Sequence, residues 1–440
     1  MGRIKNVLSL ARGELWLLPL AICLAAAGLG FWLVHALPLQ EAGARDHWWL
    51  YGGDSDTARE LLSSLVSGLM TMTSLVISIT FVILTLAANQ LGPRLIWDFV
   101  SDRQIQGVIG LFLGAILYEL VVLRSLDQPG STDNLPHLAI TGASVLSVLS
   151  VLSLLFYIHK VSRAIVADHV LGKVGRSLCA GAKAAGDQHN EGASAADFLA
   201  PLSALLWAPK VGYVQAVAYD HLLEIATRND LYVRLRVRAG EFVLARTLCL
   251  EVHGGQGLDG KTLRALQSAV AVGARRTPAQ DLAYSMDRLI EIAVRALSPS
   301  LNDPFTAVAA LDRLGAALET LARGGVGRRV LKDKDGAVRV LGRPIDPADL
   351  VEHAFRQIRQ NARGQPVVLA HMAHILGKLL QAAPQPWLAS AAAEQLDRIE
   401  ETAEQAGLSP SDFCDVREAI DAARRSLPLV RQPASPALRE

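Results

Sequence analysis

The segment LLSSLVSGLMTMTSLVISITFVILTLAANQLGPR, residues 61–94, decides the fold of this chain. It has no charged side chain before Arg94 and exceeds the about 20 apolar residues that span a bilayer as a helix. At about 100° per residue, one narrow face of this helix is polar. This hydroxyl stripe consists of Ser67, Thr71, Ser74, Ser78 and Thr85, with Phe81 as its only apolar member. Such a stripe needs a polar neighbour, either another helix or water.

Three further apolar spans, at residues 15–34, 105–123 and 138–158, accompany this one. Most positive side chains near the spans gather on one side of a four-span topology, and only Arg45, Arg59 and Arg124 lie near the other side. The residues on the first side are Arg3, Lys5, Arg12, Arg94, Arg103, Lys160, Arg163, Lys173 and Arg176. Because positive residues favour the cytoplasmic side, both termini are expected in the cytoplasm.

Composition narrows the functional classes. The formal net charge is only +1, so no basic bias points to a nucleic-acid partner. The four cysteines have no CxxC or zinc-ligand spacing, and His371 and His374 lack a third ligand at a fixed spacing. No phosphate-binding loop, nucleophile elbow or HExxH motif is present. We therefore expect no metal, no cofactor and no enzymatic activity.

The remainder of the chain predicts a cytosolic α+β domain that is mostly helical. Strands are expected at 213–218, 232–238 and 242–252, with a helix at 221–228 and a turn at Ala239-Gly240-Glu241. Helices are expected at 260–272, 277–297 and from Asp303 to about residue 322. A hairpin should turn at Asp335-Gly336, followed by helices at 347–361, 366–382, 387–406 and 410–426.

This pattern divides the chain into five parts. Residues 1–160 form a four-helix transmembrane domain, and residues 161–208 a helical connector and linker. Residues 209–258 form a small β-rich unit, residues 259–427 a helical domain with one β-hairpin, and residues 428–440 a loose tail.

Several stretches resemble one bacterial family. They are SLVISITFVILTLAANQLGPRL in the second span, GYVQAV at 212–217, RVRAGEFVLARTLCLEV at 236–252, RRTPAQD at 275–281 and RALSPSLNDPFTA at 295–307. Together they are similar to the predicted membrane proteins called domain of unknown function 2254. The resemblance implies four spans and a cytosolic domain, without an assigned activity or catalytic residues. It favours a multi-pass protein of the bacterial inner membrane.

The hydroxyl stripe has two interpretations. The first is packing between helices, with each hydroxyl bonded to its own backbone or to a neighbouring helix. The second is a water-facing path through an oligomer, with Phe81 as an apolar constriction. Asp54, Asp56 and Glu60 precede the span and would concentrate cations at an outer mouth.

Two other groups of polar residues stand out. Glu119 is the one ionisable residue well inside a span, and it either has a functional role or pairs with Arg124 or reaches the outer interface. The second group is Arg275, Arg276, Asp281, Asn302 and Asp303, in two loops that precede helices. These residues either cap the helices or hold an anion or a subunit contact.

The sequence thus favours an oligomeric ion or small-solute channel or transport protein. Its second span would line the path, and its cytosolic domain would assemble or gate it. The alternative is an envelope scaffold or sensor whose cytosolic domain binds a ligand or partner. A membrane-bound enzyme using Asp281 and Asn302 is a third, weaker hypothesis.

Overall fold

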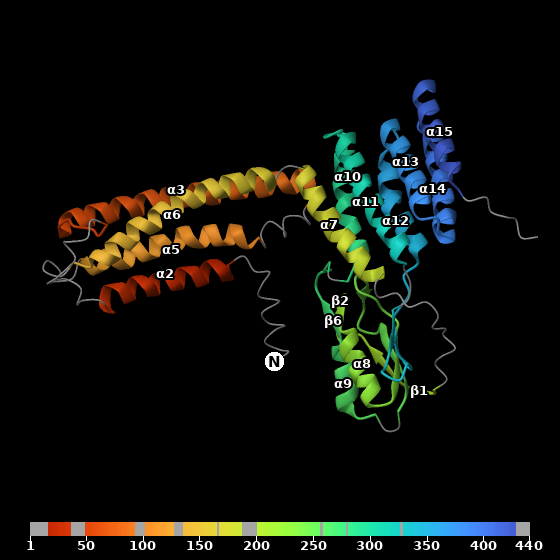
Figure 1. Cartoon of the computed structure of the whole chain (residues 1–440), viewed down its shortest axis with the longest axis horizontal. Helices are drawn as coiled ribbons and strands as arrows, with labels where there is room; N and C mark the ends of the chain where they lie inside the picture. The colour runs from red at the N-terminus through yellow and green to blue at the C-terminus, as the bar shows by residue number, and fades with distance from the viewer. Residues whose placement is uncertain are drawn as a thin grey trace, which may run out of the picture. The chain divides into compact units, whose positions relative to one another are not determined.

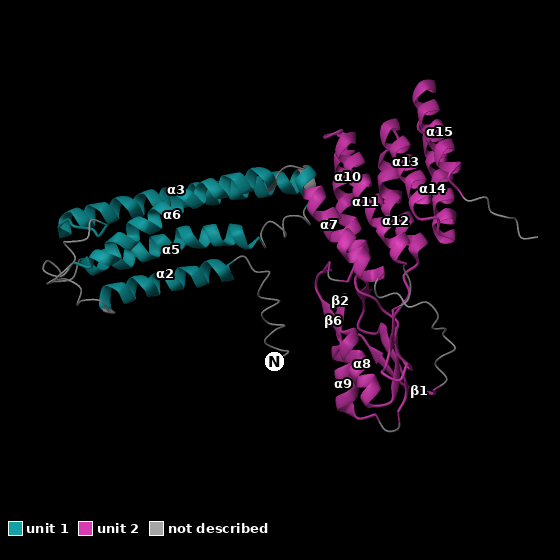
Figure 2. Ribbon diagram, viewed as in Figure 1, with its two compact units in different colours: residues 1–169 teal, residues 170–440 magenta. Residues whose placement is uncertain are grey.

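The computed structural model describes residues 16–36, 49–92, 102–126, 135–164, 167–186, 200–255, 258–278, 280–325 and 329–427. The chain forms two compact units, unit 1 at residues 1–169 and unit 2 at residues 170–440 (Figure 2). The predicted loose tail at 428–440 and the positive residues Arg3, Lys5, Arg12 and Arg94 lie outside the described residues.

Unit 1 contains four long helices, labelled in Figure 1: α2 (Leu17–Ala36), α3 (Ser55–Leu91), α5 (Arg103–Leu126) and α6 (His137–Ala164). All four are long and apolar enough to cross a membrane, as predicted. Helix α3 starts earlier than its apolar run because Asp54 caps it, accepting a hydrogen bond from the Thr57 amide at 3.1 Å. Its 37 residues extend for about 55 Å, well beyond an about 30 Å hydrocarbon core.

Helix α5 forms the centre of unit 1 and packs against α2, α3 and α6. Two of the three glycines in α5, at positions 107, 110 and 114, allow a close approach of α2. A β-carbon at Gly110 would lie 2.8 Å from Ile22 Cδ1, and one at Gly114 would lie 3.2 Å from Ala26 Cβ, whereas Gly107 faces open space. These small residues let the backbones of α5 and α2 come together.

Unit 2 contains two β-sheets. The five-stranded sheet has the order β1-β5-β3-β8-β7, and the three-stranded sheet has the order β4-β2-β6. Their bounds are β1 Leu202–Trp207, β2 Gly212–Val217, β3 Leu231–Leu235, β4 Phe242–Val243, β5 Leu248–Gly254, β6 Val270–Gly273, β7 Val330–Lys332 and β8 Val338–Leu341. Strand β3 alternates buried and half-buried residues, and Leu231, Val233 and Leu235 enter a core shared by both sheets.

The single strand predicted at 242–252 was wrong, because the chain there changes sheets. Strand β4 pairs with β2, and β5 pairs with β3 and β1. Between them, the Leu244 amide donates to Thr247 Oγ1 at 2.9 Å, and the Thr247 amide donates back to Leu244 O. This local turn interrupts the segment that the alternation of apolar and polar residues predicted as one continuous strand. The turn at Ala239–Glu241 therefore links two sheets and is not a hairpin.

The two predicted helices that follow were also placed partly wrongly. Helix α9 covers only Gly260–Ser268, and β6 then follows with Val270 and Val272 buried. Helix α10 (Leu282–Ala296) begins five residues after Thr277, with Asp281 as its cap. The Gln280 side chain does not cap a helix. It bonds both backbone groups of Val217, at 2.9 and 3.0 Å, and so extends the edge of β2.

The remaining helices agree closely with the sequence. They are α7 (Ala167–Gly186), α8 (Tyr219–Arg228), α11 (Pro304–Gly324), α12 (Pro347–Asn361), α13 (Pro366–Ala382), α14 (Pro386–Gln405) and α15 (Pro410–Arg424). Asp303 caps α11, with Pro304 at its first position, as predicted. The hairpin β7–β8 turns at Gly336 with φ +84°, and β8 pairs in parallel with β3.

Candidate functional site

The hydroxyl stripe of α3 faces away from the other helices of unit 1. Its hydroxyl residues, Ser67, Thr71, Ser74, Ser78 and Thr85, are all exposed, and Phe81 is 66% exposed. The opposite side of α3 is apolar and buried against α5 and α6, with Leu69 and Val76 in the core. Packing within the same bundle therefore does not account for the stripe.

The stripe is longer than the sequence suggested. Because α3 begins at Ser55, Asp56 and Glu60 are helical and lie on the same face, about 20° to either side of the centre of the stripe. Ser63 continues this line, although the predicted stripe did not include it. The outer-mouth candidates Asp54, Asp56 and Glu60 are all exposed. Asp54 caps the helix, and hydrogen bonds from Thr57 lower its pKa.

Two threonines show how the stripe presents its oxygens. Thr71 Oγ1 donates to Ser67 O at 3.0 Å, and Thr85 Oγ1 donates to Phe81 O at 2.9 Å. These hydroxyl hydrogens are engaged by the helix backbone, as the packing interpretation expected. The lone pairs remain available, so each threonine offers an acceptor to its surroundings.

Glu119 lies in the interior of unit 1, with no exposed surface. Its Oε1 accepts a hydrogen bond from Ser147 of α6, and its Oε2 has no partner among the described residues. The expected pairing with Arg124, or exposure at the interface, is wrong, because Glu119 points into the bundle. Ser150, also fully buried, leaves its hydroxyl without a partner there. The bundle thus contains a buried polar group distinct from the stripe.

Unit 2 contains a cavity of about 450 Å³. Helix α7, the loop after β3, the start of α10 and the segments flanking the hairpin β7–β8 surround it. Small α7 residues, including Gly181 and Ala184, leave room on one wall. The charged lining residues are Arg238, Glu241, Arg276, Asp281, Arg329 and Arg343. Four guanidinium groups against two carboxylates leave a net charge of +2 on the wall.

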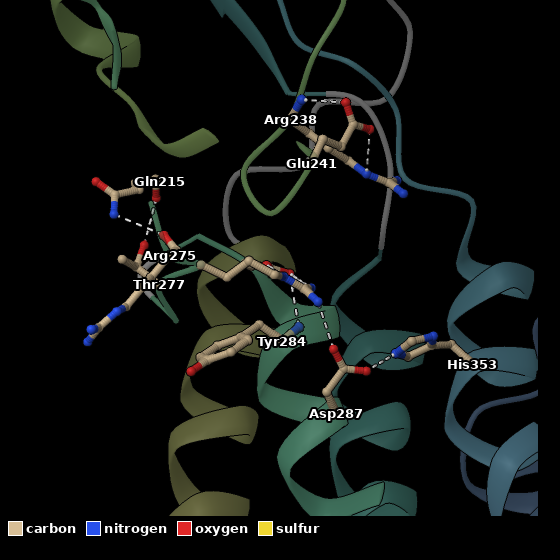
Figure 3. Close-up of polar contacts among 10 residues, drawn as sticks. Gln215, Arg238, Glu241, Arg275, Thr277, Tyr284, Asp287 and His353 are labelled. Carbon is tan, nitrogen blue, oxygen red and sulfur yellow. Dashed lines mark hydrogen bonds and ion pairs between the residues drawn. The ribbon is translucent and has the colours of Figure 1, made fainter. Parts of the chain in front are cut away.

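Arg276 is the centre of an ion-pair network beside the cavity. Its Nε and Nη2 bond the two oxygens of Asp281 at 2.8 and 3.0 Å, and its Nη1 bonds Asp287 at 2.7 Å. Asp287 in turn meets His353 Nε2 at 2.7 Å, as Figure 3 shows. Burial alone would lower the pKa of Arg276, but the two aspartates raise it overall, so the guanidinium stays charged.

A second ion-pair group lies at the turn between β3 and β4. Glu241 Oε1 lies 3.2 Å from Arg238 Nε, and Oε2 accepts from Arg343 Nη1 at 2.8 Å. Figure 3 shows Glu241 turned toward Arg238. The Glu241 carboxylate thus pairs with both Arg238 and Arg343. Most N–H groups of these two guanidinium groups have no partner in the described part of the chain.

Arg329 differs from the other three arginines of the wall. Its guanidinium lies 4.1 Å from the ring centre of Tyr219, and its Nε is buried without a hydrogen-bond partner in the described ranges. No described acid pairs with it. Burial raises the pKa of Tyr219, partly offset by Arg329. The result is a half-buried guanidinium group held by an aromatic ring.

Only part of the predicted polar-loop group reaches this cavity. Arg276 and Asp281 line it, whereas Arg275, Asn302 and Asp303 do not. Arg275 O accepts from Gln215, and Asn302, at φ +46°, accepts from Gln365 at 2.6 Å. Sequence reasoning missed Arg238, Glu241, Arg329 and Arg343. Within the described ranges, no group of three or more His, Cys, Asp or Glu side chains is placed to hold a metal ion.

Comparisons with known proteins extend this description. The profile of the family described as "Predicted membrane protein (DUF2254)" matches residues 12–378. Uncharacterised proteins of Mycobacterium bovis and Mycobacterium tuberculosis are each 27% identical over 448 residues, covering 99% of this chain and 84% of theirs. No solved structure matches the chain significantly.

Proposed function

Because the chain belongs to the DUF2254 family of predicted membrane proteins, we propose a function for its four candidate spans. In this proposal, the protein is an oligomeric ion or small-solute channel or transport protein of the bacterial inner membrane. Helix α3 lines the path, and unit 2, on the cytoplasmic side with both termini, assembles or gates it. No catalytic role is part of this proposal.

The outward direction of the hydroxyl stripe carries the proposal. A helix that met only lipid would place its apolar face outward and its hydroxyls inward. Helix α3 instead exposes Ser67, Ser74 and Ser78 beside apolar side chains such as Phe81, which is 66% exposed, whereas Val76 is 2% exposed. Copies of the chain that bring their α3 stripes together would enclose an oxygen-lined path with Phe81 as its apolar constriction.

The chemistry of the stripe favours cations. Thr71 and Thr85 donate their hydrogens to the backbone and so turn lone pairs outward. Asp56 and Glu60 extend the same face at its N-terminal end. Together these groups attract cations and replace part of an ion's hydration shell.

Cysteine accessibility tests whether the stripe meets water. In a background with Cys23, Cys179, Cys249 and Cys414 replaced by serine, Ser74→Cys is treated in membranes with a charged thiol reagent. We expect rapid labelling, because the thiol faces the path. Leu155→Cys on α6, 64% exposed on the single chain, is the matched lipid-facing control and should label slowly. Equal, slow labelling at both positions would contradict the proposal.

Flux through liposomes tests the activity itself. Phe81→Ala should raise cation flux by widening the constriction, and Ser74→Leu should reduce it. Phe31→Ala on α2 removes an equally exposed ring, 59% exposed, outside the stripe and should leave flux unchanged. Absence of flux, or flux insensitive to both stripe variants, would refute the channel.

A second candidate function is a sensor whose unit 2 binds a ligand, and the arginine-lined cavity favours it. The two functions differ in oligomeric state. A protein that is monomeric in native membranes, with no flux, would leave the sensor as the better proposal.

A further inference from the structure

We propose that the unit 2 cavity is a binding site for a small, soluble phosphate-bearing molecule. The inference does not depend on the channel proposal. It rests on the charge of the wall, on an unsatisfied arginine and on the helix that starts at the cavity.

The first observation is the charge balance. Arg276 makes three hydrogen bonds to Asp281 and Asp287, and these two carboxylates balance its charge. Arg238 and Arg343 share only Glu241, and Arg329 has no acidic partner among the described residues. With Asp287 counted beside Arg276, four arginines face three carboxylates and leave one net positive charge, which favours an anionic ligand.

The second observation is the buried Nε of Arg329. A buried donor without an acceptor is unfavourable, and Arg329 Nε is the one such side-chain atom among the described residues that line the cavity. Tyr219 holds the guanidinium by its ring face, which fixes its position without supplying an oxygen. A phosphate oxygen from a ligand would satisfy this donor, because guanidinium groups match phosphate geometry.

The third observation is the N-terminus of α10. Leu282 and Ala283 are its first two residues, and both line the cavity. Asp281 accepts the Tyr284 amide at 2.9 Å, and the Leu282 and Ala283 amides have no acceptor in the described part of the chain. Free amides and the helix dipole favour an anion at this end.

The size of the cavity limits the ligand. A volume of about 450 Å³ falls in the range of sites for small molecules and cofactors. It exceeds the room that a lone phosphate needs. A phosphate ester of up to nucleotide size fits this volume, with the phosphate directed toward Arg329, Arg343 and the start of α10.

Calorimetric titration of the full-length protein in non-ionic detergent tests the site, with inorganic pyrophosphate as the probe. We expect saturable binding that Arg329→Gln weakens about 10- to 100-fold, because one charge-assisted interaction is lost. Arg343→Gln, at an arginine with a 47% exposed side chain, should weaken it in the same direction without unfolding the protein. Arg228→Gln on α8, outside the cavity, is the matched control and should bind like the wild type.

Other probes define the ligand class. Malonate should bind more weakly than pyrophosphate, and sodium chloride at equal ionic strength should not reproduce the heat. Mixed micelles containing phosphatidylglycerol test a lipid headgroup as the source of the phosphate. Binding of malonate or of the lipid in preference to pyrophosphate would overturn the assignment. Unchanged pyrophosphate affinity in both arginine variants would overturn the site itself.

Discussion

The carboxylate of Asp281 lies directly against Gly240, so that a β-carbon at position 240 would stand 2.1 Å from Asp281 Oδ2. Gly240 also has φ +93°, a conformation that other residues seldom adopt. The glycine therefore lets the turn after β3 close over the cap of α10. This contact joins the two ion-pair groups of the cavity wall.

Gly240→Ala should destabilise the protein by about 2 kcal/mol or more, since it combines a strained φ with a clash against a buried carboxylate. Gly336→Ala is the matched control. Gly336 has φ +84° but nothing within 4 Å of a β-carbon, so only the backbone cost of about 1 kcal/mol applies. Chemical unfolding of the full-length protein measures both. Equal losses would show that the Asp281 contact is unimportant.

Arg276→Met should cost about 3 kcal/mol of unfolding free energy, because it removes the cation that pairs with the buried Asp281 and leaves Asp287 with His353. Arg228→Met removes an exposed pair with Glu224 and should change stability by no more than about 0.5 kcal/mol. Denaturant titration distinguishes the two. A small effect of Arg276→Met would mean that water enters the network freely.

Gly142→Ala should destabilise unit 1 by about 2 kcal/mol. A β-carbon there would lie 2.5 Å from the Tyr118 hydroxyl, which donates to Ala139 O at 2.9 Å. Gly107→Ala faces open space and should be neutral or slightly stabilising. Thermal unfolding in detergent compares them, and a similar midpoint for the two variants would contradict this placement of Tyr118.

Asp333 gives a pH-dependent prediction. A hydrogen bond from Arg339 at 2.7 Å, with backbone bonds from Ala337 and Asp335, lowers its pKa below the ordinary 3.8. A carboxyl group whose pKa is lower in the folded than in the unfolded protein stabilises the fold at pH values above its unfolded pKa. This stabilisation is lost as the pH falls through the pKa of the folded protein. The loss of unfolding free energy caused by Asp333→Asn should thus be largest at about pH 6 and smaller below pH 3.8. An equal deficit at both pH values would contradict the shift.

The features that the sequence predicted well depend on neighbouring residues. Asp303 and Pro304 mark the start of α11 because a cap and a proline at the first helical position act within one turn. Thr277 and Gln280 have the same local signal, yet Gln280 bonds Val217 and Thr277 bonds Gln215. Both side chains thus bond backbone groups 62 or 63 residues away, and the helix does not start at Thr277. Local patterns do not contain that information.

The candidate sites follow the same rule. The hydroxyl stripe was predicted because a helix of known period fixes one face, but its outward direction depends on how α3 packs against α5 and α6. The cavity could not be predicted in full, because Arg238, Arg329 and Arg343 come from separate segments. Their meeting depends on β8 joining β3, a pairing between distant parts of the chain.

That pairing also sets an order of events during synthesis. The chain is made from the N-terminus, so β3 emerges long before Val340 and Leu341, the residues of β8 that pair with Val233 and Arg234. Until then one edge of β3 is an open template for other chains. A ribosome stalled in α11 would hold a nascent chain with an incomplete sheet, and such a product would be a substrate for chaperones and proteases.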